Sequence, residues 1–330
     1  IKLAQAEQSD LFFAGTESLL TIHNLAFMGG GSEKVLADYD LKPVCDPSLP
    51  KWAHSQPLPM AMSVCDAVVT VSPSYAREIQ TPQFGYGLEK LIKKRRKTIY
   101  GILNGIDYEK WDPSRDPYIK ARYSIGNINA RRINKSALQK NFNLPSSNQK
   151  IPLITLISRL DYQKGIDLLT DGFEQLKDLD FQLIILGSGN REIENNCQKL
   201  SEKFPERVRT ILKFDSQLAN QLYSGADMIL IPSRFEPCGL TQMIAMRYGC
   251  LPIARATGGL KDTIQDGING FLFNEFSSSA LLEALKKAIG IFKKQKRNWR
   301  WMQENAMRAD FSWQKSAKAY ARLYLKLLAN

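Results

Sequence analysis

The run IPLITLIS at residues 151–158, followed by RLDYQKG at 159–165, decides the fold of this chain. A short, continuous stretch of β-branched and aliphatic residues indicates a strand buried on both faces, as in a parallel sheet. Similar apolar runs follow at 181–187, 208–214, 227–233, 250–256 and 270–273, and helical patterns lie between them at 166–176, 191–203, 218–224 and 240–248. This alternation predicts βαβ units and a doubly wound α/β domain.

The N-terminal part of the chain carries a weaker version of the same pattern. Apolar runs predict strands at 19–24, 67–72 and 102–107, and the segment 29–59, rich in Gly, Pro and Asp, is interpreted as an irregular insertion. Three strands without a full set of crossovers do not make a complete doubly wound domain. Helices are predicted for the remaining segments at 133–142, 279–292, 296–308 and 312–328.

Composition excludes several classes of protein. Among 330 residues, 44% are hydrophobic and 24% are charged, which fits a globular chain and not a disordered one. The apolar runs have the length of strands and fall far short of a bilayer span, so no membrane association is expected. The net charge of +12 includes two basic runs, at 93–97 and 293–300. No nucleic-acid-binding motif accompanies them, and we interpret both as solvated helix faces, with no nucleic-acid partner.

Cysteine and histidine usage narrows the chemistry further. The five cysteines form no CxxC pair, which favours a reducing compartment, the cytoplasm. His23 and His54 are the two histidines in the sequence, which excludes a His-rich metal site. Neither lies near a GxSxG elbow, so a Ser-His-Asp hydrolase is disfavoured. We interpret His23, at the end of a predicted strand, as a structural residue first and as a cleft residue second.

Three loops of the C-terminal part carry residues able to bind a ligand or take part in a reaction. Ligands of doubly wound sheets bind at the carboxyl ends of the strands. There the first loop offers Arg159 and Lys164, and the second offers Glu236 before a predicted helix start; the glycine-containing turns comprise Gly239, Leu240, Thr241, Gly258 and Gly259. Two cations and amide-rich turns, in which glycine permits close approach of the backbone, suit a diphosphate.

The diphosphate predicted here is a leaving group. Neither GxGxxG nor GxxxxGK[ST] is present, so the pattern is neither a standard dinucleotide fingerprint nor a P-loop. No DxD lies at the end of a predicted strand, and no metal is expected. A diphosphate held by Arg and Lys alone points to side chains that neutralise the charge developing on departure.

Six motifs carry a resemblance to a known family, from about residue 19 to the C-terminus. SRLDYQKG, ILIPSRFEPCGLTQ, RATGGLKDTI, VSPSYAREI, GILNGID and DFSW resemble motifs of bacterial glycogen synthases and plant starch synthases. The resemblance implies the GT-B fold, with two Rossmann-like domains facing a cleft. It also implies a cofactor-free, retaining transfer of glucose from ADP-glucose to the nonreducing end of an α-1,4-glucan. If the source is a photosynthetic eukaryote, the resemblance implies a location in the plastid instead of the cytoplasm.

The resemblance also implies domain boundaries and residue roles. Residues 1–108 would be the remainder of the acceptor-side domain, 109–311 the donor-binding domain, and 312–330 a helix that crosses back to the first. Arg159 and Lys164 would bind the donor diphosphate, and Glu236 would support the oxocarbenium-like transition state. The other implied donor-binding residues are Asn104 in the interdomain cleft, Cys238, Gly239 and Leu240 at the glucose hydroxyls, Thr241 at the distal phosphate, and Gly258 and Gly259.

Departures from the family pattern qualify these roles. Phe214 stands where some members stack a Tyr on adenine, and Ile244 stands where broader GT-B relatives place a second Glu. The KxGGL and HDWH segments of the family are not in this sequence, which begins with Ile. We therefore expect an incomplete N-terminal domain, weak ADP binding and poor turnover, with this chain a fragment of a longer protein.

Two alternatives remain open at this stage. One is a glycosyltransferase that uses UDP-glucose or another acceptor, because a Phe ring at 214 does not by itself select a base. The other is a noncatalytic polyglucan-binding protein. Intact Arg159, Lys164 and Glu236 argue against this second alternative.

Overall fold

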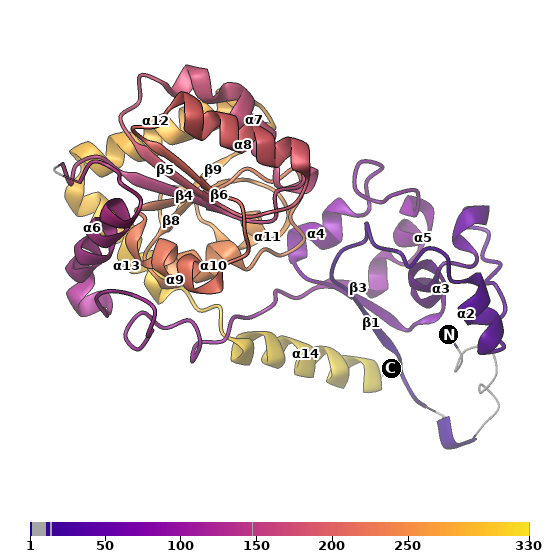
Figure 1. The fold of residues 1–330 in the computed structure, drawn as a ribbon. Helices are drawn as coiled ribbons and strands as arrows, with labels where there is room; N and C mark the ends of the chain where they lie inside the picture. The colour runs from indigo at the N-terminus through magenta and orange to yellow at the C-terminus, as the bar shows by residue number, and fades with distance from the viewer. Residues whose placement is uncertain (2–10, 14, 147, 330) are drawn as a thin grey trace. The chain divides into compact units, whose positions relative to one another are not determined.

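The computed structural model describes residues 1, 11–13, 15–146 and 148–329, which form two compact units (Figure 1). The first unit comprises Ile1–Asn104 together with Gln314–Asn330, and the second comprises Gly105–Trp313. Each unit is built around its own parallel sheet. The α/β, GT-B type fold predicted from the sequence is confirmed, with a small sheet in the N-terminal unit.

The sheet of the second unit has six parallel strands, in the order β6-β5-β4-β7-β8-β9. They are β4 (Leu153–Ile157), β5 (Gln182–Leu186), β6 (Val208–Ile211), β7 (Met228–Ile231), β8 (Leu251–Arg255) and β9 (Phe271–Phe273). Every strand lies inside the range predicted for it. The inner strands β4, β5, β7 and β8 are almost wholly buried, and a strand buried on both faces reads as one apolar run. The order reverses direction between β4 and β7, and such a reversal places the loops after both strands at a common crevice.

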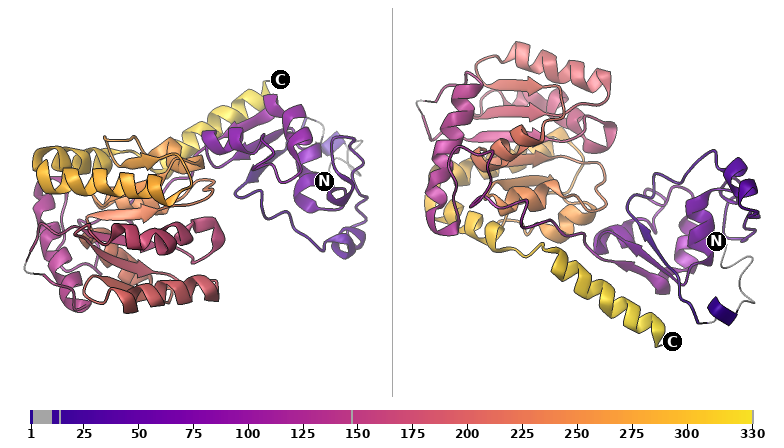
Figure 2. Two further views of the ribbon diagram at one scale, coloured as in Figure 1. Left: turned by 90° about the horizontal axis from the view of Figure 1, so that it is seen from above. Right: turned by 60° about the horizontal axis from the view of Figure 1, so that its bottom comes forward.

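Helices cover both faces of this sheet (Figure 2). They are α6 (Arg131–Asn141), α7 (Ile166–Gly172), α8 (Arg191–Lys203), α9 (Ser216–Gly225), α10 (Thr241–Arg247), α11 (Gly258–Thr263), α12 (Ser278–Lys294) and α13 (Lys296–Arg308). On one side α7 packs against α8 and α12, and on the other α10 packs against α9 and α13. The helix predicted at 166–176 ends at Gly172 and continues as a 3-10 turn, Phe173–Leu176.

A buried ion pair ties the amino ends of β4 and β7 together. The Asp227 carboxylate, directly before β7, accepts a hydrogen bond from the backbone N–H of Leu153 at 2.8 Å. Its Oδ2 also lies 2.7 Å from Nζ of Lys135 on α6, whose side chain is 4% exposed. One carboxylate thus joins two strands and a helix at the amino end of the sheet.

The first unit contains three parallel strands in the order β1-β2-β3. They are β1 (Leu19–Ile22), β2 (Ala67–Thr70) and β3 (Ile99–Gly101), and the helices are α2 (Glu33–Asp38), α3 (Pro57–Val64), α4 (Pro73–Glu78), α5 (Glu89–Lys94) and the C-terminal α14 (Trp313–Leu328). Leu323 of α14 packs with Val69 and Ile102 in a buried cluster. The last helix therefore forms part of the core of this unit.

Two predictions for the first unit are wrong. The third strand is Ile99–Gly101 and not 102–107. The N–H of Ile102 still donates to the Thr70 carbonyl at 2.9 Å, and the chain leaves the sheet after that residue. A β-carbon at Gly101 would lie 2.4 Å from Cα of Pro73, so glycine permits the close approach of the strand to α4. The insertion 29–59 is not wholly irregular, because α2 and a 3-10 turn, Lys51–Ala53, form within it.

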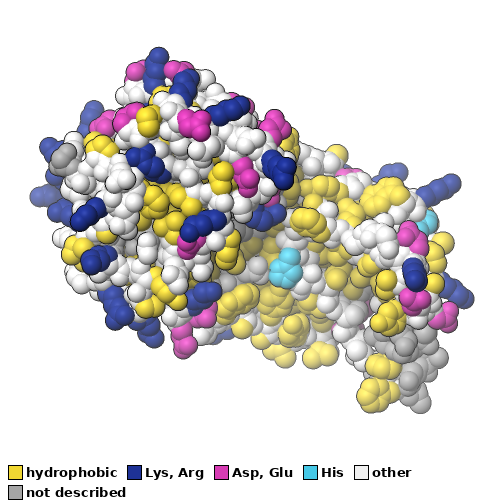
Figure 3. All heavy atoms as spheres, in the orientation of Figure 1, with side chains coloured by type: hydrophobic (Ala, Val, Ile, Leu, Met, Phe, Trp, Pro, Cys, Tyr) yellow, Lys and Arg dark blue, Asp and Glu magenta, His cyan; other side chains and the backbone are white. Residues whose placement is uncertain are grey.

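Two observations concern the surface of the chain. None of the helices in the described ranges is both long and apolar enough to cross a membrane. On the face of the second unit seen in Figure 3, Lys and Arg side chains are spread over many elements and interspersed with acidic ones. This face carries no single basic stripe of the kind that tracks a nucleic-acid backbone.

The Asp227 pair yields the first prediction. Asp227→Asn keeps an acceptor for Leu153 but leaves the buried Lys135 ammonium without its counter-charge, so we expect a loss of about 3 kcal/mol of unfolding free energy. The control is Lys287→Ala, which removes an ion pair to Asp266 with side chains 49% and 43% exposed. It should cost less than about 1 kcal/mol. Urea denaturation measures both, and equal losses would contradict the role given to Asp227.

Candidate functional site

The loops after β4 and β7 meet at the strand-order reversal of the second unit, and their charged side chains meet with them. Nζ of Lys164 lies 2.7 Å from Oε2 of Glu236, although 72 residues separate the two in the sequence. Both side chains are largely buried, at 19% and 9% exposure. Oγ of Ser233 donates a second hydrogen bond to the same Oε2 at 3.0 Å. The Glu236 carboxylate is therefore held by a charge and by a neutral donor.

The loop after β4 is shaped by one residue with a left-handed backbone. Asp161 caps a 3-10 turn, Tyr162–Lys164, by accepting a hydrogen bond from the Lys164 N–H at 3.2 Å. Gly165 then adopts φ of +65°, and a β-carbon there would lie 2.1 Å from the Pro232 carbonyl oxygen. Glycine at 165 thus allows the first loop to press against the end of β7, which brings Lys164 to Glu236.

Arg159 belongs to the same loop but has different partners. Its Nη1 lies 2.7 Å from Oδ2 of Asp161, and its Nη2 donates to Oε1 of Gln163 at 3.3 Å. The side chain is 63% exposed. The structure therefore brings Lys164 and Glu236 together, whereas Arg159 stands at the surface of the loop.

The turn before α10 closes around a small cavity. Lys164, Glu236, Gly239, Leu240 and Thr241 all line this cavity, whose volume is about 70 Å³. Gly239 has φ of +71°, Leu240 is the N-cap, and Thr241 is the first residue of the helix. Five predicted site residues thus share one hollow at the end of β7.

The third loop packs directly on the second. The N–H of Gly259 donates to the Glu236 carbonyl at 3.0 Å. A β-carbon at Gly258 would lie 2.0 Å from the Glu236 carbonyl oxygen, and one at Gly259 would lie 2.0 Å from the carbonyl oxygen of Cys238. The expectation that the Gly259 N–H is offered to a ligand is corrected here, because that group already bonds within the protein. These two glycines support the backbone that carries Glu236.

The remaining predicted residues lie apart from the cavity or in the other unit. Cys238 is buried at 5% exposure, whereas Phe214, between β6 and α9, is 88% exposed and presents its ring to solvent. His23 is exposed directly after β1, and Asn104 is half-buried at the end of the first unit's N-terminal segment. Among the described residues, no three His, Cys, Asp or Glu side chains gather into a metal-binding group.

Several supporting residues were missed by sequence reasoning. Arg234 forms two hydrogen bonds with the Asp167 carboxylate, of 2.7 and 2.5 Å, and its guanidinium lies 3.6 Å from the centre of the Tyr162 ring. Gln163 donates to the Phe235 carbonyl at 3.2 Å. Ser233 could have been found, because it ends the predicted strand three residues before Glu236. The Arg234 pair could not, because its partners, Asp167 of α7 and Tyr162 of the first loop, are distant in the sequence.

Taken together, the two parallel sheets, the reversal at β4 and β7 and the cation–carboxylate pair there define a GT-B glycosyltransferase. The Glycosyl transferases group 1 model matches residues 139–302, and the Starch synthase catalytic domain model matches residues 1–94. The chain belongs to the glycogen synthase and starch synthase family, as the resemblance of its motifs indicated.

Individual relatives support this assignment. Glycogen synthases of Thermotoga petrophila and Thermotoga maritima are 41% and 40% identical over 337 residues, an alignment covering 100% of this chain and 69% of theirs. The catalytic domain of starch synthase IV from Arabidopsis thaliana, solved with ADP and acarbose, has a TM-score of 0.87 and 33% identity, covering 97% of this chain and 70% of that one. Sucrose-phosphate synthase from Thermosynechococcus elongatus, 21% identical with a TM-score of 0.59, shares the fold.

The glycine contacts beneath Glu236 yield the second prediction. Gly259→Ala places a methyl group against the Cys238 carbonyl, and the loops must separate, so we expect a loss of about 1 to 3 kcal/mol of stability. Gly290→Ala in α12 is the matched control, because a β-carbon there meets nothing within 4 Å. It should gain about 0.5 to 1 kcal/mol from helix propensity. Thermal unfolding of both variants checks the difference in sign, and a neutral Gly259→Ala would contradict the packing described.

Proposed function

We propose that this chain binds ADP-glucose at the loops after β4 and β7 and transfers glucose, with retention, to the nonreducing end of an α-1,4-glucan. The observation that carries the proposal is the Lys164–Glu236 pair at the strand-order reversal, 2.7 Å between Nζ and Oε2. The Arabidopsis starch synthase IV domain, which was solved bound to ADP and acarbose, supports the choice of ligands. Donor binding is assigned to residues 109–311, and the acceptor side to 1–108 with the helical segment 312–330.

The cations of the first loop act on the leaving group. When the bond between C1 of glucose and the diphosphate oxygen breaks, negative charge develops on the departing ADP. Lys164, whose side chain is only 19% exposed, offers a cation of low hydration to that charge. Arg159, at the exposed rim of the same loop, adds a planar donor set suited to phosphate oxygens. Its bonds to Asp161 and Gln163 lie at the surface, where exchange for a phosphate costs little.

Glu236 acts on the sugar. A carboxylate beside C1 stabilises the positive charge of an oxocarbenium-like transition state. Lys164 balances this carboxylate when no donor is bound, and it turns toward the diphosphate when one is. Ser233 keeps its bond to the same oxygen, so the carboxylate stays in place while Lys164 changes partner. One lysine can thus serve both groups in sequence.

The other predicted contacts complete the donor site. The turn of Gly239, Leu240 and Thr241, which lines the same cavity as Glu236, would hold the sugar and the phosphates. The exposed Phe214 ring would stack on the adenine. His23 and Asn104 are proposed as contacts from the first unit. Cys238 contributes its backbone, because its side chain is buried.

The third prediction concerns the binding of nucleotide. Lys164→Ala removes the buried cation, and the Kd for ADP should rise about tenfold or more, since a hydrogen bond to a charged group is worth about 1.5 to 3 kcal/mol. Lys177→Ala, an exposed lysine of the same unit, is the control and should leave the Kd unchanged. Isothermal titration calorimetry with ADP and with UDP measures both. Tighter binding of UDP than of ADP would sink the donor assignment and favour the UDP-glucose alternative.

The fourth prediction separates catalysis from binding. Glu236→Gln keeps the shape of the side chain and an acceptor for Ser233, but it removes the negative charge. We expect transfer of labelled glucose from ADP-glucose to glycogen to fall about 100-fold or more, with the Kd for ADP changed less than about threefold.

Two outcomes would contradict this assignment. A rate unchanged by Glu236→Gln removes Glu236 from the reaction. ADP affinity lost in parallel with the rate makes Glu236 a structural support of the nucleotide site. The noncatalytic alternative predicts glycogen binding that Glu236→Gln leaves intact, together with no transfer by the unsubstituted chain.

A further inference from the structure

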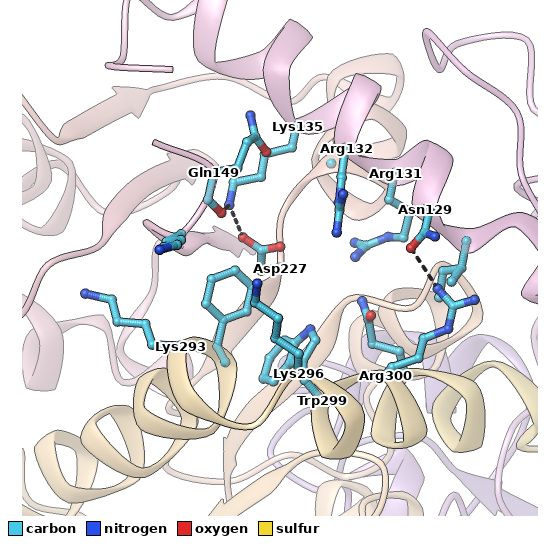
Figure 4. A pocket seen from close by; sticks show the side chains of 15 residues that line it. Asn129, Arg131, Arg132, Lys135, Gln149, Asp227, Lys293, Lys296, Trp299 and Arg300 are labelled. Atoms are coloured by element: carbon cyan, nitrogen blue, oxygen red, sulfur yellow. Dashed lines mark hydrogen bonds and ion pairs between the residues drawn. The ribbon is translucent and has the colours of Figure 1, made fainter. Parts of the chain in front are cut away.

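A second pocket of the same unit lies at the opposite end of the strands that carry the site. Its volume is about 370 Å³, and its lining comes from α6, α12, α13 and the segments that precede β4 and β7 (Figure 4). Lys150 stands shortly before β4, and Asp227 directly before β7. The Lys164 and Glu236 loops leave the carboxyl ends of these two strands, so the two pockets are distinct.

The lining of this pocket is strongly cationic. Arg132, Lys150 and Lys296 line it and form no ion pair within the described part of the chain. Lys293 and Arg300 also line it, although each has an acidic partner, Asp180 at 2.7 Å and Glu304 at 2.8 Å. Among its described lining residues the single acid is Asp227, which Lys135 already neutralises. Arg132, Lys150 and Lys296 are exposed cations that line one hollow without a protein counter-ion among the described residues.

One buried donor in the pocket also lacks an acceptor. Arg131 is 6% exposed, and its terminal nitrogen donates to the carbonyls of Tyr223 and Ala226, which fixes the guanidinium. Its Nε is buried and has no hydrogen-bond partner among the described residues. In Figure 4, Arg131 and Arg132 of α6 lie across the pocket from Lys296 and Trp299 of α13. Arg131 is thus a buried cation held in a fixed position at the pocket, and an anion there would balance its charge.

The rest of the lining suits an organic group better than a bare ion. Phe292 and Trp299 form an apolar wall, with ring centres 5.1 Å apart in an edge-to-face contact. The amide side chains of Asn129, Gln149 and Gln303 lie around the same hollow and offer partners for hydroxyl groups. Aromatic carbon with a few polar groups is typical of small-molecule pockets of about 300 to 1,000 Å³.

We propose that this pocket binds a small phosphorylated sugar, with the phosphate between Arg131, Arg132 and Lys296 and the sugar against Phe292 and Trp299. Arginine and lysine are the residues that recognise phosphate. A volume of about 370 Å³ suits a single small molecule. The proposal does not depend on the donor site, since none of these residues lines the Lys164–Glu236 cavity.

The test is calorimetric titration of the full chain at low ionic strength with three probes: ribose 5-phosphate, inorganic phosphate and ribose. Ribose 5-phosphate should bind at one site per chain, and inorganic phosphate about tenfold more weakly, because it cannot use the aromatic wall. Ribose should give no measurable heat. Equal affinity for inorganic phosphate would overturn the sugar part of the proposal, and no binding of either phosphate would overturn it entirely.

Matched variants locate the binding site. Arg132→Ala with Lys296→Ala should weaken ribose 5-phosphate about tenfold or more and leave the Kd for ADP unchanged. The control, Lys286→Ala with Arg297→Ala, removes the same charge from exposed positions of α12 and α13 outside the pocket and should change neither. Lys164→Ala should leave ribose 5-phosphate binding intact. Equal weakening by the control pair, or loss on Lys164→Ala, would place the binding elsewhere and overturn the proposal.

Discussion

The ion pair between Lys164 and Glu236 depends on one topological constraint, the reversal of strand order between β4 and β7. In a parallel sheet every loop at the carboxyl edge points the same way, and only at a reversal do two neighbouring loops diverge to opposite faces and leave room between them. Lys164 and Glu236, which are 72 residues apart in the sequence, meet there because the loops that carry them follow the two strands at the reversal. The sheet core, with β4 and β7 almost wholly buried, supplies the rigidity that fixes their separation.

Backbone contacts convert this constraint into a precise site. Gly165 against the Pro232 carbonyl and Gly259 against the Cys238 carbonyl leave no space for a side chain, so three loops are pressed into one layer. The cost is that backbone donors are used up, as the Gly259 N–H shows by bonding to Glu236. Electrostatic stabilisation of a transition state requires groups already in place, and a layer of interlocked loops meets that requirement better than a flexible one. The hydrogen bond from Ser233 likewise holds the Glu236 carboxylate in place.

The sequence was sufficient to predict the features that neighbouring residues determine, namely the strands of the second unit and the loops that follow them. The inner strands β4, β5, β7 and β8 read as apolar runs because both of their faces are buried, and the site loops follow β4, β7 and β8 directly. What the sequence could not provide are contacts between distant segments, such as the hydrogen bond from Gln163 to the Phe235 carbonyl or the Arg234–Asp167 pair. The strand predicted at 102–107 failed for a related reason. Ile99–Gly101 is a short, half-buried strand, and its last residue, Gly101, lies against Pro73, a residue of another element.

The basic run at 293–300 shows how far tertiary placement changes the meaning of a charge pattern. On a single helix surface these residues are ordinary solvated cations, which is how the sequence alone is interpreted. Packing of α13 beside α6 sets Lys296 and Arg300 opposite Arg131 and Arg132, and it adds the Trp299 ring of the same run. Cations on separate elements repel one another when brought into one hollow, and a bound anion relieves this repulsion. The two ends of the same strands therefore differ electrostatically. At one end a cation is balanced by a carboxylate, and at the other a balanced pair, Lys135 with Asp227, lies beside cations that form no ion pair among the described residues.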